Sequence, residues 1–134
     1  MKKIKEKILS INMTWSKVII IAILSSIYTV AMLLIPGLKD TSFVNIGVCF
    51  ECWVLLAIII IVNSKSNLDA ALKTFVFFLI SQPLIYLSEI IIDVIFFDKS
   101  FIITFVTYYN NYYIHGGWLF LTILTIPGAF IAYQ

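Results

Sequence analysis

Long apolar stretches with few charges are the feature of this sequence that most constrains its fold. Hydrophobic residues make up 62% of the 134 residues, whereas Lys contributes nine formal charges and Asp and Glu together seven. Soluble domains average about 45–50% apolar and about 25% charged residues. Disordered chains need low hydrophobicity and a high net charge, but the net charge here is only +2. The composition therefore excludes both classes and predicts an integral membrane protein.

The apolar residues divide into four stretches of the length that a spanning helix needs, about 20 residues. They cover about residues 17–35, 43–62, 74–96 and 117–133. The first stops at Pro36 and Gly37, a helix terminator. The third helix is expected to begin near Leu68 with Asn67 as its N-cap, before it enters the hydrocarbon. The predicted fold is all-α, a single transmembrane domain over residues 1–134 with a bundle of four transmembrane helices.

Two further segments are predicted to lie on the membrane surface. The N-terminal one is amphipathic, with Lys between apolar residues at helical spacing, and the alternative is a frayed basic tail. Its apolar residues are Ile4, Ile8, Ile11 and Trp15. The second segment, residues 101–115, separates a polar helix face from an aromatic one, which predicts an uncharged outer interfacial helix. A re-entrant hairpin is the alternative for this segment.

The distribution of Lys predicts the orientation of the chain. Five Lys occur by residue 17, and Lys65 and Lys73 fall near the second loop, whereas Lys39 and Lys99 lie in the other loops. We therefore expect both termini in the cytoplasm, and the abundant Ile and Lys without Arg suggest a bacterial plasma membrane. No basic stripe remains elsewhere for nucleic acid. No charge follows Lys99, so we also expect a longer protein that supplies a basic anchor after Gln134.

Three carboxylates are predicted within the outer half of the bilayer. Glu51 lies in the second span, and Glu89 and Asp93 lie in the third. A charged residue at the centre of a spanning helix costs about 2.5–3.5 kcal/mol, so such residues usually face a cavity and serve function. Glu89 and Asp93 are one turn apart on a face that continues to Tyr86 and Gln82. We predict that these five residues form an outward-facing site in which Glu51 binds a cation or a proton, assisted by Glu89 and Gln82.

Each acid also has a structural explanation. Asp93 is near Asp98 in the sequence, and marking the solvated end of its helix is the preferred explanation for it. Glu89 is one turn deeper and fits either explanation, while Glu51 fits a protonated acid hydrogen-bonded for helix packing. A lone histidine at a membrane boundary, here His115, is typical of an interfacial hydrogen-bonding residue. We therefore predict no metal site.

Cys49 and Cys52 form a C-x-x-C motif in the outer part of the second span. With four spans and an inner N-terminus, this placement resembles the quinone-dependent disulfide-forming membrane oxidoreductases of the DsbB type. The resemblance implies that the pair passes electrons from a periplasmic thiol oxidase to quinone. However, the chain lacks the second Cys pair and the Arg of that family, and Glu51 disfavours a thiolate. Packing roles for both cysteines are the preferred explanation.

Residues 77–87 and 118–133 are similar to small, uncharacterised bacterial multi-spanning integral membrane proteins. This resemblance implies a multi-pass location and carries no activity. The sequence has no phosphate-binding glycine loop, H-E-x-x-H motif or nucleophile elbow, so we expect no enzymatic activity and no cofactor. The expected function is that of a small transporter or a subunit of one, with a structural membrane subunit as the main alternative. The expected partners are the lipid bilayer and a second copy or another membrane protein.

Overall fold

The computed structural model describes residues 11–35, 37, 41–43, 46 and 50–134, and this part of the chain is helical without strands. The helices are α2 (Trp15–Leu34), α4 (Phe50–Val62), α5 (Asn67–Phe97), α6 (Phe101–Val106), the π-helix η1 (Thr107–Ile114) and α7 (Trp118–Ala132). The predicted all-α class is confirmed.

Three helices are long and apolar enough to cross a membrane. They are Trp15–Leu34, Asn67–Phe97 and the continuous segment Phe101–Ala132, which joins α6, η1 and α7. Helix α4 is apolar but has only 13 residues. The span predicted over 43–62 includes residues 44, 45 and 47–49, which lie outside the described residues. The described helices therefore do not reproduce the predicted count of four spanning helices.

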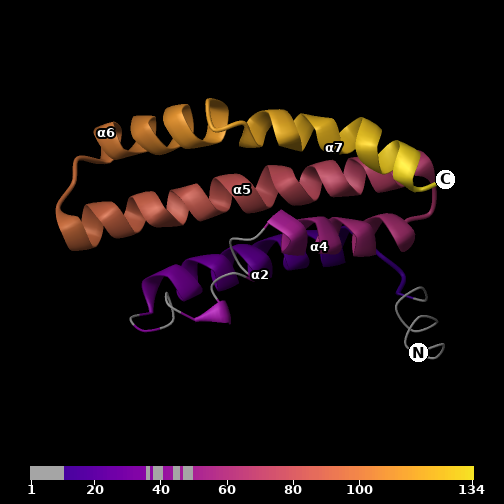
Figure 1. The fold of residues 1–134 in the computed structure, drawn as a ribbon, viewed down its shortest axis with the longest axis horizontal. Helices are drawn as coiled ribbons and strands as arrows, with labels where there is room; N and C mark the ends of the chain where they lie inside the picture. The colour runs from indigo at the N-terminus through magenta and orange to yellow at the C-terminus, as the bar shows by residue number, and fades with distance from the viewer. Residues whose placement is uncertain (1–10, 36, 38–40, 44–45, 47–49) are drawn as a thin grey trace.

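Helix α5 is the centre of the structure, and α2, α4 and α7 all pack against it (Figure 1). Helices α2 and α5 run in the same direction. At one end the Lys73 Nζ donates a hydrogen bond to the Met13 carbonyl at 2.6 Å, and further along the Ser26 hydroxyl donates to the Ser81 carbonyl at 3.0 Å. Helices α4 and α7 run the opposite way along α5, and the three helices together line a groove. The described start and the C-terminus consequently lie at the same end.

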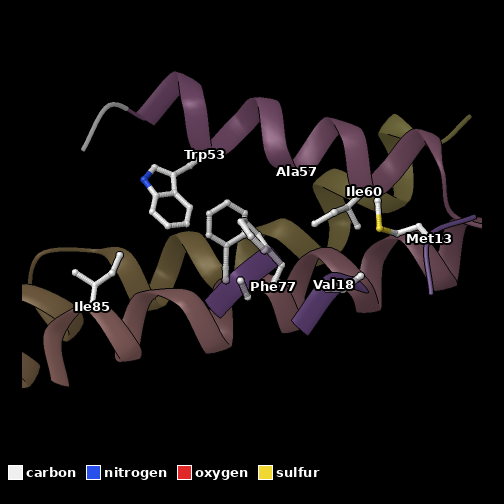
Figure 2. Packing of buried hydrophobic residues seen from close by; sticks show 9 residues of the cluster. Met13, Val18, Trp53, Ala57, Ile60, Phe77 and Ile85 are labelled. Carbon is white, nitrogen blue, oxygen red and sulfur yellow. The ribbon is translucent and has the colours of Figure 1, made fainter. Parts of the chain in front are cut away.

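The hydrophobic core joins α2, α4 and α5 (Figure 2). Trp53 of α4 places its ring centroid 5.8 Å from that of Phe77 of α5, and Phe77 meets Phe78 edge to face at 5.0 Å. Small residues on the other helices let the backbones approach, as Ala22 of α2 and Ala57 of α4 do within this core. Aromatic contacts thus join α4 to α5, and small and aliphatic residues of α2, Val18 and Ala22, complete the core.

Helix α5 begins one residue earlier than predicted. Ser66, not Asn67, is the N-cap, because its backbone is extended and its hydroxyl accepts a hydrogen bond from the Asp69 N–H at 3.2 Å. Asn67 instead donates from Nδ2 to the Phe130 carbonyl of α7 at 3.2 Å. This contact fixes the C-terminal end of α7 beside the start of α5.

Residues 101–115 differ from the predicted separate interfacial helix. After a turn at Asp98, α6 and η1 run back along the C-terminal half of α5 and continue into α7 (Figure 1). A hydrogen bond joins η1 to α5 in this arrangement, because the Tyr109 hydroxyl donates to the Pro83 carbonyl at 2.9 Å. Since α2 has 20 residues and α5 has 31, the α5–α6 hairpin extends past the end of α2.

The amphipathic N-terminal helix falls mainly on residues 1–10, which lie outside the described residues. Of its four predicted apolar positions, Ile11 and Trp15 are described. Residues 11–14 are not helical, and α2 begins at Trp15. The described part therefore contains only the end of the predicted segment, where Trp15 already belongs to the first long helix.

Candidate functional site

Four helices meet around a pocket of about 150 Å³ in which α5 supplies most of the polar groups. Helix α2 contributes an hydroxyl and an aliphatic side chain, and α4 and α7 each contribute a tryptophan. The lining residues are Thr29, Leu33, Trp53, Gln82, Ile85, Tyr86, Glu89 and Trp118. The pocket therefore combines one carboxylate, one amide and two hydroxyl groups with three aromatic side chains.

The polar face of α5 forms because Gln82, Tyr86 and Glu89 are spaced by four and three residues. This spacing places them on one side of a helix. The structure brings all three to the same pocket, as their spacing predicts.

Gln82 is buried at the wall of the pocket, with 4% of its surface exposed, the same fraction as Thr29. Its Nε2 has no hydrogen-bond partner among the residues that the structure describes. A buried donor left without an acceptor costs about 1–3 kcal/mol. The amide is therefore an unsatisfied polar group at the wall of a cavity, where an added acceptor would remove that cost.

Glu89 lies two turns further along α5 and is partly buried. Within the described part of the chain it makes no ion pair, because Lys99 pairs with Asp93 and Lys73 pairs with Asp69. A partly buried carboxylate is stable only when a proton, a cation or several donors compensate its charge. The pocket consequently has an acidic group whose countercharge the neighbouring helices do not supply.

Tyr86 stands between these two groups and belongs to an aromatic cluster. Its ring centroid lies 6.4, 6.3 and 6.1 Å from those of Tyr108, Tyr109 and Tyr113 of η1. Such tilted and edge-to-face pairs are favourable arrangements of aromatic rings. The cluster therefore holds the Tyr86 side of the pocket in one position and ties it to the π-helix.

Asp93 lies in a different pocket from Gln82, Tyr86 and Glu89. Its carboxylate accepts hydrogen bonds from Lys99 Nζ at 2.7 Å and from the Tyr108 hydroxyl at 3.2 Å. It lines a second pocket of about 250 Å³ formed with α6 and η1, which Glu89 does not line. Its charge is thus compensated within the protein, and its predicted partnership with Glu89 in one cavity does not form.

Glu51 also lies away from the pocket. It is exposed in the first turn of α4, and neither the pocket of Glu89 nor that of Asp93 includes it. Its predicted depth rests on a helix starting near residue 43, and several of the residues between are not described. Of the two cysteines, Cys49 lies outside the described residues, whereas Cys52 is partly buried beside Trp53 in a small pocket of about 30 Å³.

The sequence did not indicate the residues that other helices bring to the pocket. Trp53 extends from α4 toward α5, where Ile85 lies (Figure 2), and Trp118 reaches the same pocket from the start of α7. Each occurs in an apolar stretch in which aromatic residues are common, so spacing within one helix does not single them out. Their meeting depends on how α4 and α7 are placed against α5.

Comparison of the chain with family models, curated proteins and solved structures finds no significant match.

Proposed function

We propose that this chain is an integral membrane protein, a small transporter or a subunit of one, that binds a cation or a proton at Glu89. The observation that carries the proposal is the partly buried Glu89 carboxylate, which makes no ion pair in the described part of the chain and lines a pocket between four helices. Carboxylates placed in this way are typical of ion and proton pathways in membrane proteins.

A membrane location is supported by the surface of the helices. Leu24 and Ile27 on α2 and Phe120 and Ile131 on α7 each expose more than half of their surface. In water these large apolar faces would favour aggregation, whereas in a bilayer they contact lipid. With the predicted orientation, the pocket lies in the outer half of the membrane.

The geometry changes the centre of the predicted site. We assign the binding of the cation to Glu89, with Gln82 and Tyr86, in place of Glu51. Glu51 is exposed at the start of α4, and Asp93 already has Lys99 as its ion-pair partner. We therefore assign neither of these acids a direct contact with the bound cation.

Tryptophan fluorescence provides the test, because Trp53 and Trp118 line the pocket. We expect the purified full chain in nanodiscs to respond saturably to protons or to a monovalent cation such as K⁺. Glu89→Gln should weaken the affinity that this response measures about thirtyfold or more, since removing one partner of a buried charge pair costs about 2–5 kcal/mol. Glu51→Gln is the matched control and should respond like the parent chain.

The same experiment separates the competing functions. Equal responses of the Glu89→Gln variant and the parent, or no response of the parent, would contradict the proposal. A structural membrane subunit would then be favoured by the apolar groove of about 320 Å³ between α4 and α7, whose lining includes the small residues Ala57, Gly128 and Ala132. The oxidoreductase alternative depends on Cys49, and Cys49→Ser should abolish any quinone reduction that the parent chain performs.

A further inference from the structure

We propose that the pocket selects a small organic ammonium compound that carries a hydrogen-bond-accepting oxygen about two carbon atoms from the nitrogen. This inference rests on the proposed function, since it names the class of cation that Glu89 holds. It is carried by three properties of the pocket: its size, its aromatic walls beside one carboxylate, and the unsatisfied amide of Gln82.

The size of the pocket favours a molecule over a bare ion. Its volume is about 150 Å³. A protein cavity of about that volume accommodates benzene, so about six or seven non-hydrogen atoms fit. A single proton or alkali cation would leave most of this space empty.

The walls favour an organic cation over a hard metal ion. Calcium takes about six to eight oxygen ligands and magnesium demands a near-ideal octahedral set, whereas the pocket contains one carboxylate, from Glu89. Trp53, Trp118 and Tyr86 supply aromatic surface instead. Aromatic faces beside a carboxylate are the groups that attract ammonium ions, through cation–π interactions and charge pairing.

The amide of Gln82 is the reason for placing a hydrogen-bond-accepting oxygen in the ligand. Its buried Nε2 lacks an acceptor in the described structure, and it precedes Glu89 by two helical turns, about 10 Å along the axis. An ammonium contact with Glu89, a two-carbon linker and one hydrogen bond to Gln82 together span about that distance. A ligand of this length satisfies both ends of the pocket, with Tyr86 beside its middle.

The shared chemistry is that of choline and ethanolamine, which occur both as free solutes and as lipid head groups. The test uses the full chain in phosphatidylglycerol nanodiscs, which lack ammonium head groups. Choline is compared with trimethylpropylammonium, in which a methyl group replaces the hydroxyl. Tryptophan fluorescence and calorimetry measure binding, and KCl at equal ionic strength is the control.

We expect choline to bind about three- to tenfold more tightly than trimethylpropylammonium, because one hydrogen bond contributes about 0.5–1.5 kcal/mol. Gln82→Leu and Gln82→Met should remove this preference, so that each variant binds the two compounds with equal affinity. Trp118→Leu should weaken binding of both compounds, and Glu89→Gln should abolish it. Two replacements are made at Gln82, so that one of them can still be measured if the other does not fold.

The outcomes separate this inference from the proposed function. Equal affinities of the parent chain for the two compounds would overturn the inference and leave cation binding at Glu89 intact. A failure of protons, K⁺ and both ammonium compounds to bind would overturn both. Loss of choline binding in phosphatidylethanolamine nanodiscs would assign the ligand to a lipid head group, and retention there would assign it to a free solute.

Discussion

Lys73, which the charge pattern predicts only as a cytoplasmic anchor, is a buried charged residue. In the structure it is 2% exposed, and its Nζ donates hydrogen bonds to the Asp69 carboxylate at 2.5 Å and to the Met13 carbonyl at 2.6 Å. It also lies 5.8 Å from the ring centroid of Trp15. Lys73 therefore joins the chain before α2 to the first turns of α5, and a buried ammonium group is held by satisfied hydrogen bonds.

Replacing Lys73 tests this connection. We expect Lys73→Met to lower the free energy of unfolding by about 1.5–3 kcal/mol, the usual contribution of hydrogen bonds to a charged group. Lys17→Met is the control, since Lys17 also donates to a backbone carbonyl, that of Asn12 at 2.8 Å, but is exposed. Unfolding in mixed micelles measures both variants. Similar decreases in the free energy of unfolding for the two variants would show that the burial of Lys73 does not add to stability.

The part of the candidate site that could be predicted is the part that lies on one helix. Gln82, Tyr86 and Glu89 meet because their spacing puts them on one face of α5. Asp93 shares that spacing, but the left-handed turn at Asp98 brings Lys99 back to it. That ion pair depends on the path of the chain after α5, and helical periodicity within α5 does not predict this path.

Gly116 and Gly117 form the junction between η1 and α7. Gly117 has φ +85°, a conformation that favours glycine. At Gly116, a Cβ atom would collide with the backbone carbonyl of Tyr112. By contrast, nothing lies within 4 Å of a Cβ added at Gly128, within α7. The two helical segments can therefore join as observed only with glycine at the junction.

Alanine substitutions at two glycines should act in opposite directions. Gly116→Ala is expected to cost about 1–3 kcal/mol, the usual range for overpacking, because the backbone of Tyr112 has to move. Gly128→Ala should stabilise the chain by about 0.5–1 kcal/mol, because alanine is favoured over glycine within a helix. Thermal unfolding in detergent compares the two. A neutral Gly116→Ala variant would contradict the tight junction.

Helix boundaries were predictable where the residues at the ends of an apolar stretch set them. The first predicted stretch, 17–35, corresponds to Trp15–Leu34, and the last, 117–133, corresponds to Trp118–Ala132. The π-helix was not predictable, because its residues have the composition of an ordinary interfacial segment. Its packing depends on contacts with distant parts of α5, such as the hydrogen bond from Tyr109 to Pro83.

The direction of the helices bears on how often the whole chain crosses the membrane. Since α2 and α5 run in the same direction, the chain must return from the end of α2 to the start of α5. Helix α4 runs back along this path, although its 13 residues are shorter than a usual span. If α2 and α5 both span the bilayer, the segment that contains α4 crosses it as well, which supports the predicted four crossings.

Reporter fusions test this topology. Reporters after Ser66 and after Gln134 should be active in the cytoplasm, and a reporter after Asp40 should be active outside, because the Lys-rich ends are expected inside. Fusion after Lys17 provides the control for the inner side. A reporter after Ser66 that is active outside would show that α4 does not cross and would contradict the four-crossing arrangement.

The unequal lengths of α2 and α5 connect this protein to the thickness of its membrane. Helix α2 is about 30 Å long and α5 is about 46 Å long. Near the tip of the α5–α6 hairpin, Phe96, Ile102 and Ile103 expose 74%, 73% and 69% of their surfaces. A bilayer core about 30 Å thick matches α2, whereas the part of α5 predicted within the hydrocarbon, residues 74–96, is about 35 Å long and exceeds that thickness slightly. If the chain spans a bilayer, we therefore expect the exposed tip of the hairpin to be covered better by lipids with long acyl chains than by lipids with short ones.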